Sequence, residues 1–163
     1  MEKALFSTGS TEWETPDDLF DILDQEYMFN LDVCATAQNT KCKNYYTKEQ
    51  DGLSREWIGK VWCNPPYGRE IGKWVNKAWN SYRTNKDSTI VMLLPARTDT
   101  KWIHDPIFKN ADIIFLKGRL KFGGSSNNSA PFPSMLVVFD DSKKKVWFLA
   151  NKLGGHAVLR DRT

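Results

Sequence analysis

The tetrapeptide Asn64-Pro65-Pro66-Tyr67 is the segment whose residue types are best suited to chemistry. Neither proline can donate a main-chain hydrogen bond, and the pair holds the chain extended. The Pro65 carbonyl and the Asn64 side chain are therefore expected to form two fixed oxygen acceptors beside the ring of Tyr67. An exocyclic amino group on a planar base offers two N–H donors and a π-face, which suits this arrangement. The structural alternative is a strand end followed by a rigid turn, with Tyr67 packed on the next helix.

Two aspartates are candidates for holding a ligand that carries both an ammonium group and an adenine. Asp32 ends the apolar segment 29–35, where its carboxylate can accept from the ammonium of a bound amino acid. Asp51 stands beside Gly52, where it can accept from an adenine amino group or simply start a turn. No G-x-G fingerprint follows Asp32, and its structural alternative is a cap for the next segment. Together with the amino-acceptor tetrapeptide, the two acids suit S-adenosylmethionine.

These residues lie at the ends of segments that the hydrophobic pattern predicts to be strands alternating with helices. A helix is expected over 16–27, because Thr15 is a good N-cap and Pro16 suits the first helical position. One continuous apolar stripe predicts a second helix over 71–82, and a short third helix is expected from 98 to near Pro106. Strands are expected over 29–32, 45–47, 61–63, 89–94, 113–116, 119–122, 135–139 and 146–149, the last two joined as a hairpin through 140–144.

This order predicts the α/β class, with a mostly parallel sheet and an antiparallel edge. In such sheets ligands bind beyond the carboxyl ends of the strands, where the candidate residues stand. The length of 163 residues predicts a single compact domain. No apolar run is long enough to cross a bilayer and the N-terminus lacks a signal-peptide pattern, so a cytoplasmic protein without membrane association is expected.

The composition excludes some classes of site and leaves others open. The three cysteines form no C-x-x-C pair and lie far in sequence from His104 and His156, so neither a disulfide framework nor a structural zinc site is predicted. We expect all three thiols to be small buried residues. The formal charge of +3 does not by itself indicate a nucleic-acid binder, which would require clustered basic residues.

Seven segments, taken in order along the chain, carry a resemblance to a known family. They are Trp13-x-Thr15-Pro16, Leu31-Asp32-Val33-Cys34-Ala35, Asp51-Gly52-Leu53, Trp62-Cys63-Asn64-Pro65-Pro66-Tyr67-Gly68, Leu94-Pro95-Ala96-Arg97-Thr98-Asp99-Thr100, Gly118-Arg119-Leu120-Lys121-Phe122 and Ala130-Pro131-Phe132-Pro133-Ser134. In this order they resemble the compact phage-type DNA N6-adenine methyltransferases (Dam-like) over roughly residues 13 to 139.

The resemblance implies a Rossmann-like class I S-adenosylmethionine-dependent methyltransferase fold, in one domain without a separate target-recognition domain. S-adenosylmethionine would be the methyl donor, held by Asp32, Asp51 and Cys34, with Thr15 and Pro16 near its methionine end. A site-specific transfer to N6 of a flipped adenine in DNA is implied, in the host cytoplasm if a phage encodes the chain.

By the same resemblance, the segment Asn64-Pro65-Pro66-Tyr67 would hold the target adenine, with the ring of Tyr67 stacked on the base. Phosphate contacts are expected from four basic residues near strand ends, which are Arg97, Lys101, Arg119 and Lys121. The chain is expected to act as a monomer or a homodimer. Two alternatives stay open: methylation of another amino group, such as cytosine N4 or a glutamine amide, and a catalytically inactive DNA-binding module.

Overall fold

A seven-stranded sheet forms the middle layer of the computed structural model, which describes residues 13–123 and 129–162. The strands run in the spatial order β2-β1-β3-β4-β6-β5-β7. Their bounds are β1 (Leu31–Asp32), β2 (Asn44–Tyr45), β3 (Lys60–Cys63), β4 (Thr89–Pro95), β5 (Asp112–Phe115), β6 (Ser134–Phe139) and β7 (His156–Val158). The two-residue strands β1 and β2 are shorter than expected, and β7 was not predicted.

One half of the sheet is parallel and the other half is antiparallel. Strands β2, β1, β3 and β4 pair in parallel, whereas β6 pairs antiparallel with both β4 and β5, and β5 pairs antiparallel with β7. The predicted parallel sheet is therefore confirmed for the first half, and the antiparallel part is larger than a single edge strand. Because β5 again runs in the direction of β4, the carboxyl ends of β1, β3, β4 and β5 face one edge of the sheet.

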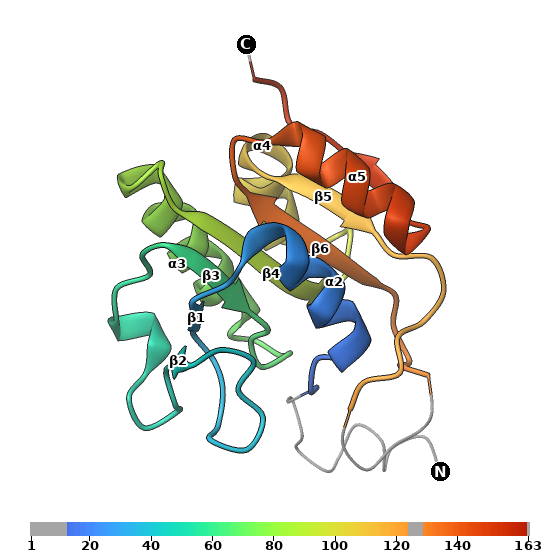
Figure 1. Cartoon of the computed structure of the whole chain (residues 1–163). Coiled ribbons are helices and arrows are strands. Elements are labelled where there is room, and N and C mark those ends of the chain that lie inside the picture. Colours follow the sequence, from blue (N-terminus) through green and yellow to red (C-terminus); the bar gives the residue numbers. More distant parts are fainter. Residues whose placement is uncertain (1–12, 124–128, 163) are drawn as a thin grey trace.

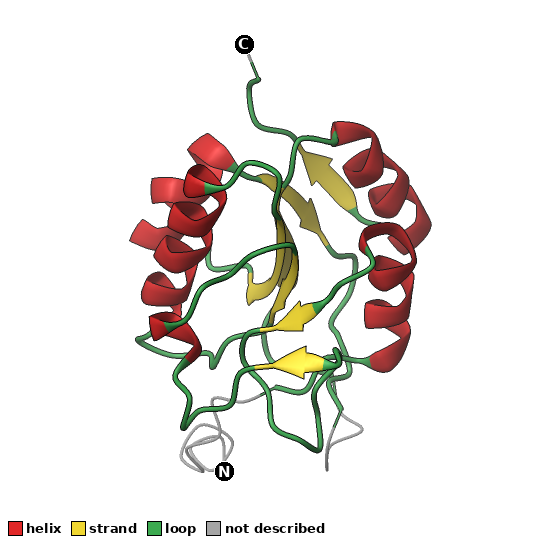
Figure 2. Cartoon of the chain, turned by 60° about the vertical axis from the view of Figure 1, so that its left-hand side comes forward, coloured by secondary structure: helices red, strands yellow, loops and turns green. Residues whose placement is uncertain are grey.

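Helices cover both faces of this sheet. Helices α2 (Asp17–Tyr27) and α5 (Lys143–Leu153) lie on one face, and α3 (Ile71–Thr84) and α4 (Phe108–Asn110) lie on the other (Figures 1 and 2). The predicted stripe of α3 is confirmed by its buried residues, which are Ile71, Trp74, Val75, Ala78 and Tyr82. Among the described residues, no helix combines the length and the apolarity needed to cross a bilayer.

Residues 146–149 were predicted to be a strand, and this prediction is wrong because they belong to helix α5. The side chain of Ser142 caps the helix by accepting a hydrogen bond of 3.4 Å from the main-chain N–H of Lys145. The buried residues of the helix are Val146, Leu149 and Ala150. Their spacing of three and four places one apolar stripe against the sheet, which is a helical pattern.

Three further local predictions are corrected or refined. Thr15 is not the N-cap of α2, because Pro16 occupies that position without a side-chain cap. Residues 119–122 form no strand, and only the adjoining Gly123 makes an isolated bridge with Glu14. The helix expected near 98–106 spans 101–110, and it is interrupted at the residue before Pro106, as the restricted backbone of that position favours.

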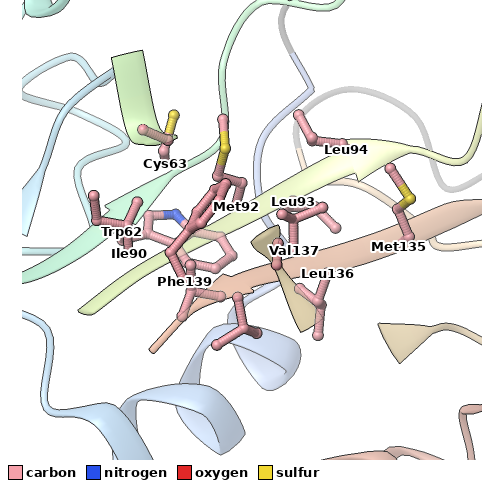
Figure 3. Packing of buried hydrophobic residues seen from close by; sticks show 14 of the residues in the cluster. Trp62, Cys63, Ile90, Met92, Leu93, Leu94, Met135, Leu136, Val137 and Phe139 are labelled. Carbon is pink, nitrogen blue, oxygen red and sulfur yellow. The ribbon is translucent and has the colours of Figure 1, made fainter. Parts of the chain in front are cut away.

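The core is centred on β4, all of whose residues are buried. Strand β6 pairs with β4 over six positions, from Ile90 opposite Phe139 to Pro95 opposite Ser134. Figure 3 shows buried side chains of β3, β4 and β6 packed around these central strands. This rigid centre fixes where β3 and β4 end, and hence where the residues that follow them lie.

Candidate functional site

A cavity of about 360 Å³ opens at the carboxyl ends of β1 and β3. Strand β1 pairs with β2 on one side and with β3 on the other, so the strand order reverses there, and such a switch point is where open α/β sheets bind ligands. The volume lies in the range of small-molecule sites. Among the predicted site residues, those that line the cavity are Thr15, Asp32, Cys34, Asp51, Asn64, Pro65 and Pro66.

Asp32 lies at the end of β1 with only 3% of its surface exposed. One carboxylate oxygen accepts from the main-chain N–H of Cys34 at 3.3 Å, and the other accepts from that of Lys41 at 3.1 Å. Burial raises the pKa of Asp32 to about 6, against the opposing effect of these two N–H donors. The side chain therefore fixes the 34–41 loop over the cavity and offers a carboxylate that a nearby cation would help to ionise.

The turn that carries Asp51 is pressed against the end of β1. Asp51 has a positive φ of 56°, and its side chain accepts from Leu53 N at 3.3 Å, as expected for a residue that starts a turn. A Cβ at Gly52 would lie 2.1 Å from the carbonyl oxygen of Val33 and 3.3 Å from the ring of Trp74. Only glycine permits this approach, which holds the exposed carboxylate of Asp51 at the cavity rim.

The side-chain amide of Asn64 uses its nitrogen in hydrogen bonds and leaves its oxygen without a partner among the described residues. Its Nδ2 donates to the carbonyl oxygen of Trp13 and, over 3.0 Å, to Thr15 Oγ1. Its Oδ1 is buried and has no hydrogen-bond partner among the described residues. An unpaired buried acceptor typically costs about 1–3 kcal/mol. This oxygen at the cavity lining therefore points to a donor supplied by a ligand.

Tyr67 differs from the other residues of the tetrapeptide, because it is only 5% exposed and does not line the cavity. Its hydroxyl donates to the carbonyl oxygen of Leu93 at 2.9 Å, and burial raises its pKa well above the usual range. Its ring packs edge-on against Phe132, at a centroid distance of 5.5 Å, and against Phe122. The ring is therefore packed rather than open for stacking, and its ring contacts are with Phe122 and Phe132 rather than with the next helix, on which the structural alternative had placed it.

The predicted phosphate-contacting residues lie outside the cavity lining but at the same edge of the sheet. Arg97 and Lys101 follow β4 and are exposed, and Arg119 and Lys121 follow β5 and are also exposed. Arg119 additionally donates to the carbonyl oxygen of Ala130 over 3.4 Å. The four cations are therefore exposed on segments that follow the carboxyl ends of β4 and β5.

The thiols differ in their relation to the cavity. Cys42 and Cys63 are buried, and burial raises the pKa of both thiols, to about 12 for Cys42. Cys34 is half-buried and lines the cavity, so it departs from the expectation of three buried cysteines. In the described part of the chain, no group of three or more His, Cys, Asp and Glu side chains is arranged to hold a metal ion.

Three tryptophans line the cavity and were missed as site residues, which are Trp13, Trp62 and Trp74. Trp13 is half-buried, and its carbonyl accepts from Asn64. Trp74 reaches the cavity from α3 and packs against Trp57 at a centroid distance of 6.0 Å. Trp13 could have been predicted as a site residue, because it lies two residues before Thr15. Trp74 could not, because in the sequence it fits the apolar stripe of a helix.

Two phage proteins are similar to this chain over most of its length. The DNA N-6-adenine-methyltransferase of Haemophilus phage HP1 (strain HP1c1) is 36% identical over 137 residues, which cover 78% of this chain and 78% of that protein. The protein of the same name from Escherichia phage T1 is 32% identical over 138 residues, covering 82% of this chain and 56% of its own length. A solved structure from Legionella pneumophila strain Philadelphia 1 matches with a TM-score of 0.46 at 12% identity, over 85% of this chain and 63% of its own. A family model described as DNA N-6-adenine-methyltransferase (Dam) matches residues 5–158. The chain therefore belongs to the DNA N-6-adenine-methyltransferase (Dam) family.

Proposed function

We propose that this chain transfers a methyl group from S-adenosylmethionine to N6 of an adenine in DNA, with the cofactor in the cavity and the target amine at Asn64 and Pro65. The family membership supports the reaction. The observation that carries the assignment of the site is the unpaired, buried Oδ1 of Asn64 at the cavity lining. An acceptor in this position requires a donor, and the exocyclic amine of adenine is one.

The residues of the cavity fit S-adenosylmethionine. The buried carboxylate of Asp32 suits a cationic group, and the exposed carboxylate of Asp51 at the rim suits the amino group of the cofactor's adenine. Thr15 and Cys34 add polar and thiol surface to the same lining, and Pro16 precedes helix α2 beside it. When bound, S-adenosylmethionine supplies an electrophilic methyl group on a positively charged sulfur.

The two oxygen acceptors of the tetrapeptide would make the target amine more reactive. The lone pair of an adenine amine is delocalised into the ring, so the amine is a poor nucleophile. Hydrogen bonds from this amine to Asn64 Oδ1 and to the Pro65 carbonyl favour a more pyramidal nitrogen and stabilise the positive charge that develops on it. Preorganised groups of this kind typically contribute about 10²–10³ in rate. Pro66 keeps the backbone extended so that both oxygens stay on the same side.

Stacking of the flipped base on Tyr67 remains part of the proposal and requires a rearrangement. Extruding a base costs a few kcal/mol, and base–aromatic stacking of about 1–3 kcal/mol offsets most of it. Phe132 is half-buried and packs against Tyr67 at 5.5 Å. To uncover the ring of Tyr67, the side chains of both Phe122 and Phe132 would have to shift, whereas the Tyr67 hydroxyl anchored on Leu93 can stay in place.

DNA would approach the edge of the sheet where the strands end. We propose that Arg97, Lys101, Arg119 and Lys121 contact phosphates there, since all four are exposed around that edge. We further propose that the described residues of this chain form a single domain with a Rossmann-like class I fold, acting as a monomer or homodimer in the host cytoplasm. The parallel strands with helices on both faces support this fold.

The test is analysis of methylated nucleosides. Unmethylated duplex DNA is incubated with the chain and isotopically labelled S-adenosylmethionine, and the digested nucleosides are separated by mass spectrometry. We expect labelled N6-methyladenine. Labelled N4-methylcytosine would indicate the other amino group, and no labelled nucleoside, together with retained binding of DNA, would indicate an inactive DNA-binding module.

A further inference from the structure

The side-chain amide of Asn64 is anchored by a segment that lies 49 or more positions away in the sequence. Both contacts come from its nitrogen, which carries two protons: one partner is the carbonyl oxygen of Trp13 and the other is Thr15 Oγ1, at 3.0 Å. A carbonyl oxygen can only accept hydrogen bonds. A flipped amide would therefore set its own oxygen against the Trp13 carbonyl, so these two contacts select the orientation in which Oδ1 is unpaired.

The anchoring segment is itself held in place. The main-chain N–H of Gly123 donates to the carbonyl oxygen of Glu14 at 3.0 Å. The ring of Trp13 packs edge-on against Phe122 at 5.4 Å and against Phe132 at 5.2 Å. Thr15 is only 5% exposed. The Gly123–Glu14 hydrogen bond and the burial of Thr15 do not depend on Phe132, and they limit the freedom of this segment. The two acceptors therefore have fixed positions, and an amide bonded to both has a fixed direction.

We propose that Thr15 is a positioning residue, whose hydroxyl oxygen and the neighbouring Trp13 carbonyl together aim Asn64 Oδ1 at the target amine. This inference rests on the proposed function, in which that oxygen accepts from adenine. Thr15 also lines the cavity, so a cofactor contact and a positioning role must be separated. A positioning role lowers turnover at saturating cofactor, whereas a cofactor contact alone raises the dissociation constant of the cofactor.

The substitutions of Thr15 differ in whether they keep the hydroxyl oxygen that accepts from Asn64. Thr15→Val keeps the shape and deletes the acceptor for Asn64, Thr15→Ala deletes it with less crowding, and Thr15→Ser keeps it. Thr84→Val is a matched control, because the Thr84 hydroxyl is exposed at the end of α3 and donates only to its own helix, to the carbonyl oxygen of Asn80. We expect Thr15→Val to lower the methyl-transfer rate about tenfold, which corresponds to about 1.4 kcal/mol of activation free energy.

The decisive experiment is a double-mutant cycle measured by single-turnover methylation of duplex DNA at saturating S-adenosylmethionine. The cycle uses Thr15→Val, Asn64→Ala and their combination, with cofactor binding measured by calorimetry and folding by thermal melting. We expect Thr15→Val to slow the wild-type chain but to have no further effect in the Asn64→Ala background. The conservative variant Thr15→Ser should recover most of the rate that Thr15→Val loses, and Thr84→Val should retain the wild-type rate. If Thr15→Val does not fold, Thr15→Ala takes its place in the cycle.

The inference and the proposed function fail in different ways. A full rate for Thr15→Val with weaker cofactor binding would overturn the positioning role and leave the proposed function intact. An equal loss of rate in both backgrounds would also overturn it, because the effect would then not pass through Asn64. A full rate for Asn64→Ala, or the absence of N6-methyladenine with the wild-type chain, would instead contradict the proposed function.

Discussion

The main chain of Gly52 lies so close to Val33 that a Cβ atom on this glycine would be 2.1 Å from the carbonyl oxygen at the end of β1. The same turn is held by a hydrogen bond of 2.8 Å from Trp57 Nε1 to the Gly52 carbonyl. The wall of the cavity therefore depends on the absence of a side chain at one position. This contact joins the turn that carries Asp51 to the strand that carries Asp32.

Gly52→Ala is expected to lower both the free energy of unfolding and the affinity for S-adenosylmethionine. The added methyl group must push the turn away from Val33, and overpacking of this kind typically costs about 1–3 kcal/mol. Urea denaturation and calorimetry measure the two effects. Gly72→Ala is the matched control: its Cβ would make only ordinary contact with Trp102, at 3.8 Å, so it should be neutral or slightly stabilising within helix α3. Equal stability of the Gly52→Ala and Gly72→Ala chains would contradict the account.

The pH dependence of cofactor binding is expected to report on Asp32. Its pKa is raised from 3.8 to about 6 by burial, and a cation bound nearby favours the ionised carboxylate. Affinity for S-adenosylmethionine should therefore fall as the pH drops through 6, by up to about tenfold per pH unit below that value. Calorimetry between pH 5 and pH 7 measures this slope. An affinity that is constant over this range would show that Asp32 does not face the cation.

The raised pKa of Asp32 predicts the opposite pH dependence for the unfolding free energy of the chain without cofactor. Because the native chain binds the Asp32 proton more tightly than the unfolded chain does, this group contributes stability that is fully present below about pH 4 and is lost as the pH rises through about 6. Asp32→Asn removes the titration but leaves one of the N–H donors of Cys34 and Lys41 facing an amide nitrogen. The difference in unfolding free energy between wild type and Asp32→Asn should therefore change by a few kcal/mol between pH 4 and pH 7. A difference that is independent of pH would refute this.

Tyr67→Phe is expected to affect stability more than catalysis. The substitution deletes the hydrogen bond to the buried Leu93 carbonyl, which should lower the free energy of unfolding by about 1–2 kcal/mol. The ring is retained, so stacking and the methyl-transfer rate should stay near wild type. Chemical denaturation and single-turnover kinetics test the two parts. A large loss of rate without a loss of stability would mean that the hydroxyl acts on the substrate.

Arg119→Ala is expected to weaken DNA binding uniformly across sequences and to reduce its salt dependence. Loss of one phosphate contact should lower the slope of log K against log salt by about 1. Fluorescence anisotropy at several salt concentrations measures the slope. Lys144→Ala is the matched control, because Lys144 is exposed at the start of α5, which follows the carboxyl end of β6 at the opposite edge of the sheet. An unchanged slope for Arg119→Ala would remove Arg119 from the interface.

The cavity residues could be predicted because local signals place them. Asp32 ends one buried strand and Asn64 follows another, and parallel strands bring their carboxyl ends to one edge. The proline pair stops the strand at a defined residue. Gly52 was noted only as a neighbour of Asp51, and its steric role depends on a carbonyl 19 positions earlier, which no local pattern reveals.

The predictions for Tyr67 and for residues 146–149 failed because they depend on how the chain packs in three dimensions. Tyr67 is covered by Phe122 and Phe132, which come more than fifty residues later in the chain, so its burial is not visible in the tetrapeptide. The run 146–149 resembles a strand because four apolar residues are consecutive. In the structure Trp147 is 52% exposed and Phe148 is 49% exposed, so the apolar run is not the buried surface of the element.

The most direct test of the central claim is the methyl-transfer rate of Asn64→Ala at saturating cofactor, measured in a single turnover on duplex DNA. Asn80→Ala serves as the control, since Asn80 is exposed on α3. We predict that Asn64→Ala binds S-adenosylmethionine with near-normal affinity and loses about 10²–10³ in rate, while Asn80→Ala is unchanged. A rate for Asn64→Ala equal to that of the wild-type chain would contradict this prediction, because the unpaired oxygen would then have no part in the reaction.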